Sequence, residues 1–82
     1  MSKPGDYPLH TLAIEKLSAI FGESKAKELI RLVLKEINLT NIQSADDLFI
    51  FSQALEKYGP IEAAVGAMLG VKAILQGAKG SK

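Results

Sequence analysis

Residues 61–75 read IEAAVGAMLGVKAIL, and the fold that we expect for the whole chain depends on this stretch. Its only charges are Glu62 near the start and Lys72 near the end, and every residue between them is apolar or glycine. Pro60 suits the first position of a helix, because its missing N–H would have no intrahelical partner there. A helix that is apolar on all sides must be covered on all sides. The stretch therefore predicts either the central helix of a bundle or a surface that another molecule covers.

The composition predicts a single folded domain. The chain has 82 residues, 48% hydrophobic and 23% charged, which is enough for one modest core. A formal net charge of +1 gives no strong indication of a nucleic-acid partner. The chain has no cysteine, which excludes disulfides and thiol chemistry. The apolar stretch is shorter than the ~20 residues of a membrane-spanning helix, and the N-terminus lacks the apolar core of a secretory signal. We therefore expect a cytoplasmic protein without a membrane span.

The hydrophobic pattern predicts three further helices. Apolar residues recur at spacings of three and four along most of the chain, and no segment alternates as a strand would. We therefore expect an all-α fold, a compact four-helix array with the apolar C-terminal helix central. The expected helices span roughly 8–21, 24–38, 44–58 and 60–76. Residues 1–7 and 77–82 are expected to be flexible ends of this single domain, 1–82.

Residues that end or begin helices mark these boundaries. Gly22 and Gly59 are placed to end helices, since glycine adopts the left-handed conformation without a steric penalty, and Asn38 can do the same. Ser24 and Ser44 are placed to cap the helices that follow, because a serine hydroxyl accepts a hydrogen bond from an unpaired backbone N–H. The links are therefore short, apart from the loop between the second and third helices.

A stripe of small residues runs along the fourth helix. It consists of Ala63, Gly66, Ala67, Gly70 and Ala73, and it includes two glycines at the G-x-x-x-G spacing. Each glycine inside a helix costs roughly 0.5–1 kcal/mol relative to alanine. Close approach of another helix is the usual compensation, and that helix can belong to the same chain or to a second subunit.

One basic row is the candidate for nucleic-acid contact. Lys27, Arg31 and Lys35 follow each other at four-residue spacing on the second helix, and Glu28 and Glu36 lie beside them. Such a row is also typical of a solvated face of mixed charge.

The sequence contains no pattern typical of catalysis, cofactor binding or metal binding. Asp46 and Asp47 are explained as helix-start carboxylates, and adjacent helical residues point about 100° apart, so they do not form a metal pair. His10 is the only histidine, without cysteine or a spaced carboxylate to share a metal. Phosphate loops, nucleophile elbows and dinucleotide fingerprints are absent. We therefore expect no cofactor and no enzymatic activity.

The surplus of apolar helix surface predicts a protein–protein interaction module, which either forms a homodimer or docks on a larger partner. The residues expected at this interface are Phe49, Ile50, Ala63, Gly66, Ala67, Gly70 and Ile74. Two alternatives stay open: a nucleic-acid-binding regulator that uses Lys27, Arg31 and Lys35, and a carrier of an apolar ligand in the bundle core.

Overall fold

The computed structural model describes residues 8–77, and within that range it is all-α, with four α-helices, one short 3-10 helix and no strand. The α-helices are α1 Pro8–Phe21, α2 Glu23–Glu36, α3 Ala45–Leu55 and α4 Pro60–Leu75, and the 3-10 helix is η1 Glu56–Tyr58. The predicted all-α four-helix array is confirmed. The flexible ends were predicted at 1–7 and 77–82, and apart from Gly77 these residues lie outside the described range.

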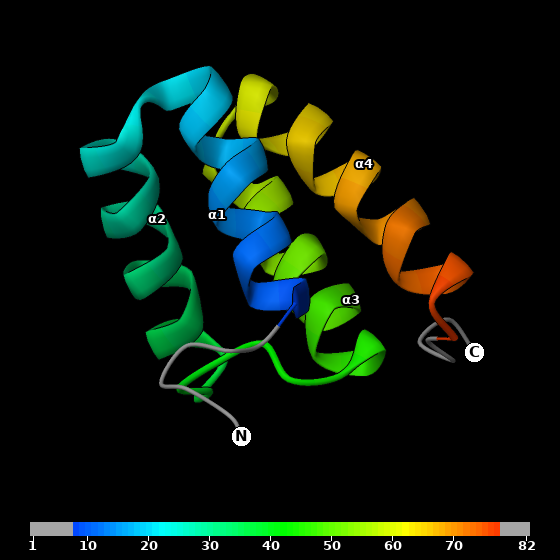
Figure 1. The fold of residues 1–82 in the computed structure, drawn as a ribbon. Helices are drawn as coiled ribbons and strands as arrows, with labels where there is room; N and C mark the ends of the chain where they lie inside the picture. Colours follow the sequence, from blue (N-terminus) through cyan, green and yellow to red (C-terminus); the bar gives the residue numbers. More distant parts are fainter. Residues whose placement is uncertain (1–7, 78–82) are drawn as a thin grey trace.

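The helices form two hairpins that pack against each other. Consecutive helices run in opposite directions, with α1 and α2 in one hairpin and α3 and α4 in the other (Figure 1). The closest packing is within each hairpin, while the backbones of α2 and α4 lie apart on opposite sides of the array. The radius of gyration of 11.6 Å matches the value of about 12 Å typical of a compact domain of this length.

The predicted boundary residues act largely as expected. Gly22 has φ of 89° and separates α1 from α2 without any longer link. It also serves as the N-cap of α2, so the prediction that Ser24 caps this helix is wrong. Ser44 caps α3, and its hydroxyl accepts the backbone N–H of Asp47 at 3.1 Å. The last turn before Gly59 tightens into η1. The third helix, predicted to end at residue 58, is therefore α-helical only as far as Leu55.

Asn38 ends α2 in the left-handed conformation, as predicted, with φ of 66°. The N–H of Leu39 donates to the carbonyl of Leu34 at 2.9 Å, and the N–H of Asn38 donates to that of Lys35 at 3.2 Å. This pair of bonds is a Schellman motif, which satisfies carbonyls that the end of a helix leaves unpaired. It also brings Leu39 back against the core, so the loop begins in a fixed position.

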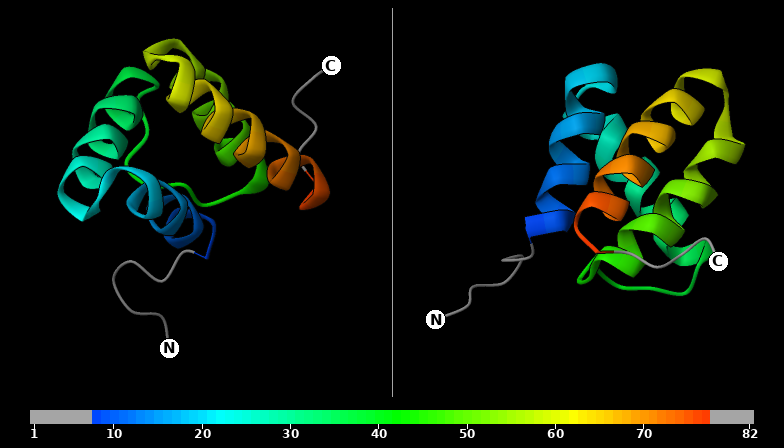
Figure 2. Two further views of the ribbon diagram at one scale, coloured as in Figure 1. Left: turned by 90° about the horizontal axis from the view of Figure 1, so that it is seen from above. Right: turned by 90° about the vertical axis from the view of Figure 1, so that its right-hand side faces the viewer.

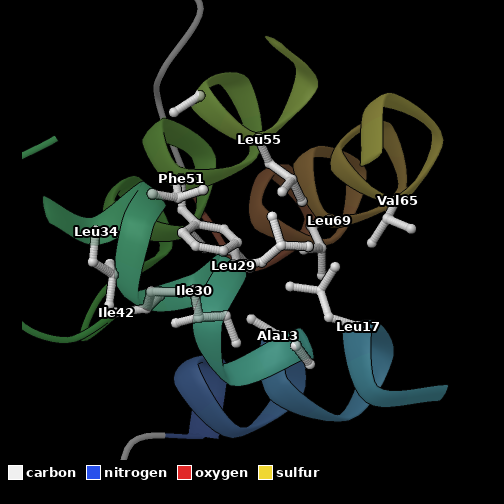
Figure 3. Packing of buried hydrophobic residues seen from close by; sticks show 14 of the residues in the cluster. Ala13, Leu17, Leu29, Ile30, Leu34, Ile42, Phe51, Leu55, Val65 and Leu69 are labelled. Atoms are coloured by element: carbon white, nitrogen blue, oxygen red, sulfur yellow. The ribbon is translucent and has the colours of Figure 1, made fainter. Parts of the chain in front are cut away.

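Buried side chains from all four helices and from the loop between α2 and α3 make one core. Phe51 of α3 lies among Leu29 and Ile30 of α2, Leu69 of α4 and Ile42 of the loop (Figure 3). Phe51, Ile42 and Leu69 are fully buried. The core therefore holds the two hairpins together and fixes the loop between α2 and α3.

The expectation that α4 is the central helix is wrong, because α4 lies at the edge of the array. Only five of its sixteen residues are buried: Val65, Gly66, Leu69, Gly70 and Ala73. It packs mainly on α3 and η1, it also contacts α1, and its backbone does not come close to that of α2. The residues on the opposite side of α4 are exposed. Within residues 8–77, no helix combines the length and apolar character that a bilayer crossing needs.

Candidate functional site

The two glycines of the small-residue stripe bring α4 close to α3 of the same chain. A Cβ atom on Gly66 would lie 2.7 Å from the backbone oxygen of Ser52 and 2.8 Å from Cγ of Glu56. A Cβ atom on Gly70 would lie 3.2 Å from Oγ of Ser52. Ser52 is itself buried, and its hydroxyl donates to the carbonyl oxygen of Phe49 at 2.6 Å. The structure therefore explains both glycines by intramolecular packing.

The side of α4 that points away from α3 is apolar and exposed. We call it the outer face of α4, and it consists of Ile61, Ala64, Ala67, Met68, Val71, Ile74 and Leu75, all of which are exposed. Val71 is 59% exposed and Leu75 is 75% exposed, so large apolar side chains of this face are open to solvent. No residue of the outer face carries a charge, and Lys72 lies at its edge. Contiguous apolar surface of this kind makes the outer face of α4 a candidate interaction site.

The residues predicted at the interface do not form one surface. Gly66 and Gly70 are buried against α3, and Ala63 and Phe49 are half-buried. Ile50 is exposed, but it precedes Ser52 by two residues and so points about 200° around α3 from the residue that contacts α4. Of the seven predicted residues, only Ala67 and Ile74 belong to the outer face of α4.

Five residues of the outer face were missed from the sequence. Ile61, Ala64, Met68, Val71 and Leu75 follow each other at alternating spacings of three and four, which is the pattern of a coiled-coil seam. The pattern was hidden because the residues between them are also apolar. The large residues opposite the two glycines were the signal that could have identified this surface.

α1 extends the apolar surface beside α4. The two helices lie side by side on one face of the array (Figure 2, right). Between them is a groove of about 350 Å³, lined by Lys16, Met68, Leu69, Val71, Lys72 and Leu75. Ile20 follows Lys16 by one turn of α1, so it lies on the same side of that helix, and it is 48% exposed. The seam residues of α4 thus border a shallow apolar groove with a lysine on each side.

The predicted basic row lies on the surface of α2, on the other side of the array. Lys27, Arg31 and Lys35 are all exposed. Glu23 pairs with Lys27 at 3.2 Å, and Glu28 approaches Arg31 at 3.9 Å, so the row is partly neutralised. Both pairs are solvent-exposed, and such pairs contribute little to stability. The three cations line another groove, which has a volume of about 600 Å³.

His10 has a defined structural partner. Its Nδ1 accepts the backbone N–H of Ile42 at 3.2 Å, a contact between residues that are 32 positions apart. Nδ1 can accept only when it carries no proton, so the bond requires the neutral imidazole. Partial burial lowers the pKa of His10 below its ordinary value, which also favours the neutral form. His10 therefore holds the loop between α2 and α3 against α1.

This contact predicts a loss of stability at mildly acidic pH. Because the folded-state pKa is lowered, the unfolded chain takes up the proton first as the pH falls through about 6.5. The free energy of unfolding should therefore fall as the pH drops from about 6.5 towards the lowered folded-state pKa, and protonation of Nδ1 then removes its hydrogen bond from Ile42. Urea titrations between neutral and mildly acidic pH measure it. His10→Gln keeps an acceptor but cannot titrate, so an equal loss of stability in that variant would contradict the assignment.

No metal-binding cluster was found among the described residues, where no three His, Cys, Asp or Glu side chains gather. The fold and the two surfaces therefore identify the protein only as a small all-α domain, with an exposed apolar helix face and a separate basic groove. Comparisons of the chain with protein-family models, with curated proteins and with solved structures gave no match. The outer face of α4 and the basic groove beside α2 are therefore the two candidate functional surfaces.

Proposed function

We propose that the protein is a non-enzymatic interaction module of the cytoplasm that self-associates through the outer face of α4. The observation that supports this proposal is the uninterrupted apolar character of that face, with Met68 44% exposed and Ile61 55% exposed. A lone exposed leucine or isoleucine is ordinary on a protein surface. A whole helix face without a charge is not ordinary, because its exposure to water is unfavourable along its full length. A second copy of the same face would exclude that water.

The spacing of the seam residues suits an antiparallel pair of α4 helices. In such a pair with Met68 opposite Val71 of the second copy, Ala64 falls opposite Leu75 of that copy. Ala64 then faces the large Leu75 and Met68 faces Val71, so no layer places two small side chains opposite each other. A parallel pair would place Ala64 opposite its own copy and leave a gap there. The antiparallel arrangement is also a closed two-fold contact, which limits assembly to a dimer.

The expected dimer is weak. Covering a half-exposed side chain of this size contributes about 1 kcal/mol, so five large residues from each copy contribute roughly 10 kcal/mol together. Association costs an estimated 4–15 kcal/mol in lost freedom of motion, depending on the treatment. The balance indicates association that depends on concentration, in the micromolar range or weaker, rather than an obligate dimer.

A charge placed in the seam should abolish self-association. In Val71→Lys, each copy would bury an unpaired ammonium against Met68 of the other, and the dissociation constant should rise at least tenfold. Leu32→Lys is the matched control, because Leu32 is a 39% exposed leucine on α2, away from α4. Sedimentation of the wild type and both variants over a micromolar to millimolar series measures the effect. Both variants should be as stable as the wild type, since neither substitution touches the core.

Two results of this experiment contradict the proposal. A wild type that stays monomeric throughout the series would show that α4 needs no second copy. Equal weakening by Leu32→Lys and Val71→Lys would place the contact elsewhere. The nucleic-acid interpretation of the basic row stays a prediction, and binding that weakens steeply with salt would mark it.

A further inference from the structure

The groove on the α1–α2 side has walls of different chemistry. Lys27, Arg31 and Lys35 form one wall, since four-residue spacing places them along one side of α2. His10 and Ile14, one turn apart on α1, form the opposite wall. The remaining lining residues are Ile30 and Leu34 at the base and Asn38, Leu39 and Thr40 at one end. The Schellman motif and the bond from Ile42 to His10 fix that end in position.

The polar groups around this groove are predominantly hydrogen-bond donors. The two lysines and the arginine have no acceptor atoms. His10 uses Nδ1 to accept from Ile42, so its remaining proton is on Nε2, where it can be donated. Among the described residues that line the groove, none is acidic. Lys35, moreover, makes no ion pair with any residue of the described range. A ligand that satisfies this rim must supply acceptors and negative charge.

The base of the groove is apolar, so it suits an apolar part of the ligand and not its charged group. Ile14 and Leu39 are half-buried and pack against the core, while Ile30 and Leu34 are buried beneath them. The volume of about 600 Å³ lies within the range of small-molecule pockets, about 300–1,000 Å³. We propose that this groove binds a small amphipathic anion, with its apolar part on Ile14 and Leu39 and its carboxylate or phosphate on Arg31 and Lys35.

A small anion suits this site better than a polyanion. The row from Lys27 to Lys35 spans only about 12 Å along the helix, which is short for a nucleic-acid track. Glu23 and Glu28 flank the row and would repel a phosphate chain that ran past its end. A polyanion would also leave the apolar base uncovered. The site is separate from the outer face of α4, so this proposal does not depend on self-association.

Eight-carbon amphiphiles with different headgroups test the two parts of the proposal, which are the role of the cations and the role of the apolar base. Octyl phosphate and octanoate are the anionic probes, octanol and octyltrimethylammonium are the uncharged and cationic controls, and inorganic phosphate is the headgroup alone. Amide chemical shifts of the full chain report the position of binding. Both anionic probes should shift amides of residues 10–14 and 30–40. They should bind at least tenfold more tightly than octanol, octyltrimethylammonium or inorganic phosphate.

Substitutions at exposed positions identify the cations that matter. Arg31→Gln and Lys35→Gln should each weaken octyl phosphate binding about tenfold, because each removes a charge-assisted hydrogen bond. Lys25→Gln is the matched control, since it removes one positive charge from the same helix at a position outside the groove, and binding should change less than twofold. All three residues are exposed, so the fold should tolerate the changes.

Four outcomes would overturn the proposal. Equal binding of octanol would remove the role of the cations, and equal binding of inorganic phosphate would remove the role of the apolar base. Shifts confined to the outer face of α4 would place amphiphile binding there instead. Binding of a thymidine oligonucleotide without binding of octyl phosphate would also overturn it, and would assign the row to nucleic acid.

Discussion

Gly66→Ala is expected to lower the free energy of unfolding by about 1–3 kcal/mol, although alanine is the better helix former. The added Cβ would lie 2.7 Å from the backbone oxygen of Ser52, closer than the two atoms can pack. That oxygen belongs to the α3 backbone and cannot rotate away as a side chain could. α3 and α4 would have to separate, which would loosen the contact between Leu69 and Phe51.

Gly70→Ala is the matched control for this substitution. It gains the same helix propensity, but its Cβ meets only the hydroxyl of Ser52, at 3.2 Å, where a few tenths of an ångström suffice. The Gly70→Ala protein should be about as stable as the wild type. Ser52→Ala removes the hydroxyl that this Cβ would meet, so it should relieve the remaining close contact. Urea denaturation of the three variants measures the differences. A Gly66→Ala protein as stable as Gly70→Ala would contradict the close approach of α3 and α4.

Phe51→Ala is expected to have the largest effect of any single change, a loss of about 3–5 kcal/mol. Phe51 is fully buried between the two hairpins, and its removal leaves a cavity that rigid neighbours cannot fill. A domain of this length has a total stability of about 4–12 kcal/mol. The variant should therefore be marginally stable or unfolded at room temperature.

Phe49→Ala serves as the control for Phe51→Ala, because it makes the same change two residues earlier on α3. Phe49 is only half-buried, so its loss should be clearly smaller. Thermal unfolding followed by circular dichroism compares the two, with a shift of about 4–8 °C for each kcal/mol in a domain of this size. A larger loss at Phe49 would mean that the core is centred elsewhere.

The fold was largely predictable because the sequence marks its own helix boundaries. Gly22, Asn38, Ser44 and Gly59 each adopt a boundary role for a local reason that the sequence shows: a left-handed φ, a cap, or both. The error at Ser24 has a simple cause. A glycine followed directly by helix leaves no room for a separate capping serine, so Gly22 serves both helices.

The functional surfaces were less predictable, because periodicity does not say which side of an all-apolar helix is covered. The glycines at 66 and 70 were read as compatible with a second subunit, but Ser52 occupies the space beside them. The opposite side of α4 then became the exposed one. Similarly, the basic row was visible in the spacing of α2, whereas its opposite wall at His10 and Ile14 depends on how α1 packs.

The central claim is that the outer face of α4 is the contact between two copies, and a dilution series followed by amide chemical shifts tests it without any substitution. The account predicts that the shifts change with concentration at Ile61, Ala64, Met68, Val71 and Leu75, together with Ile20 beside them on α1. The amides of α2 should stay constant. Shifts that are independent of concentration, or that change on α2 and not on α4, would contradict the account.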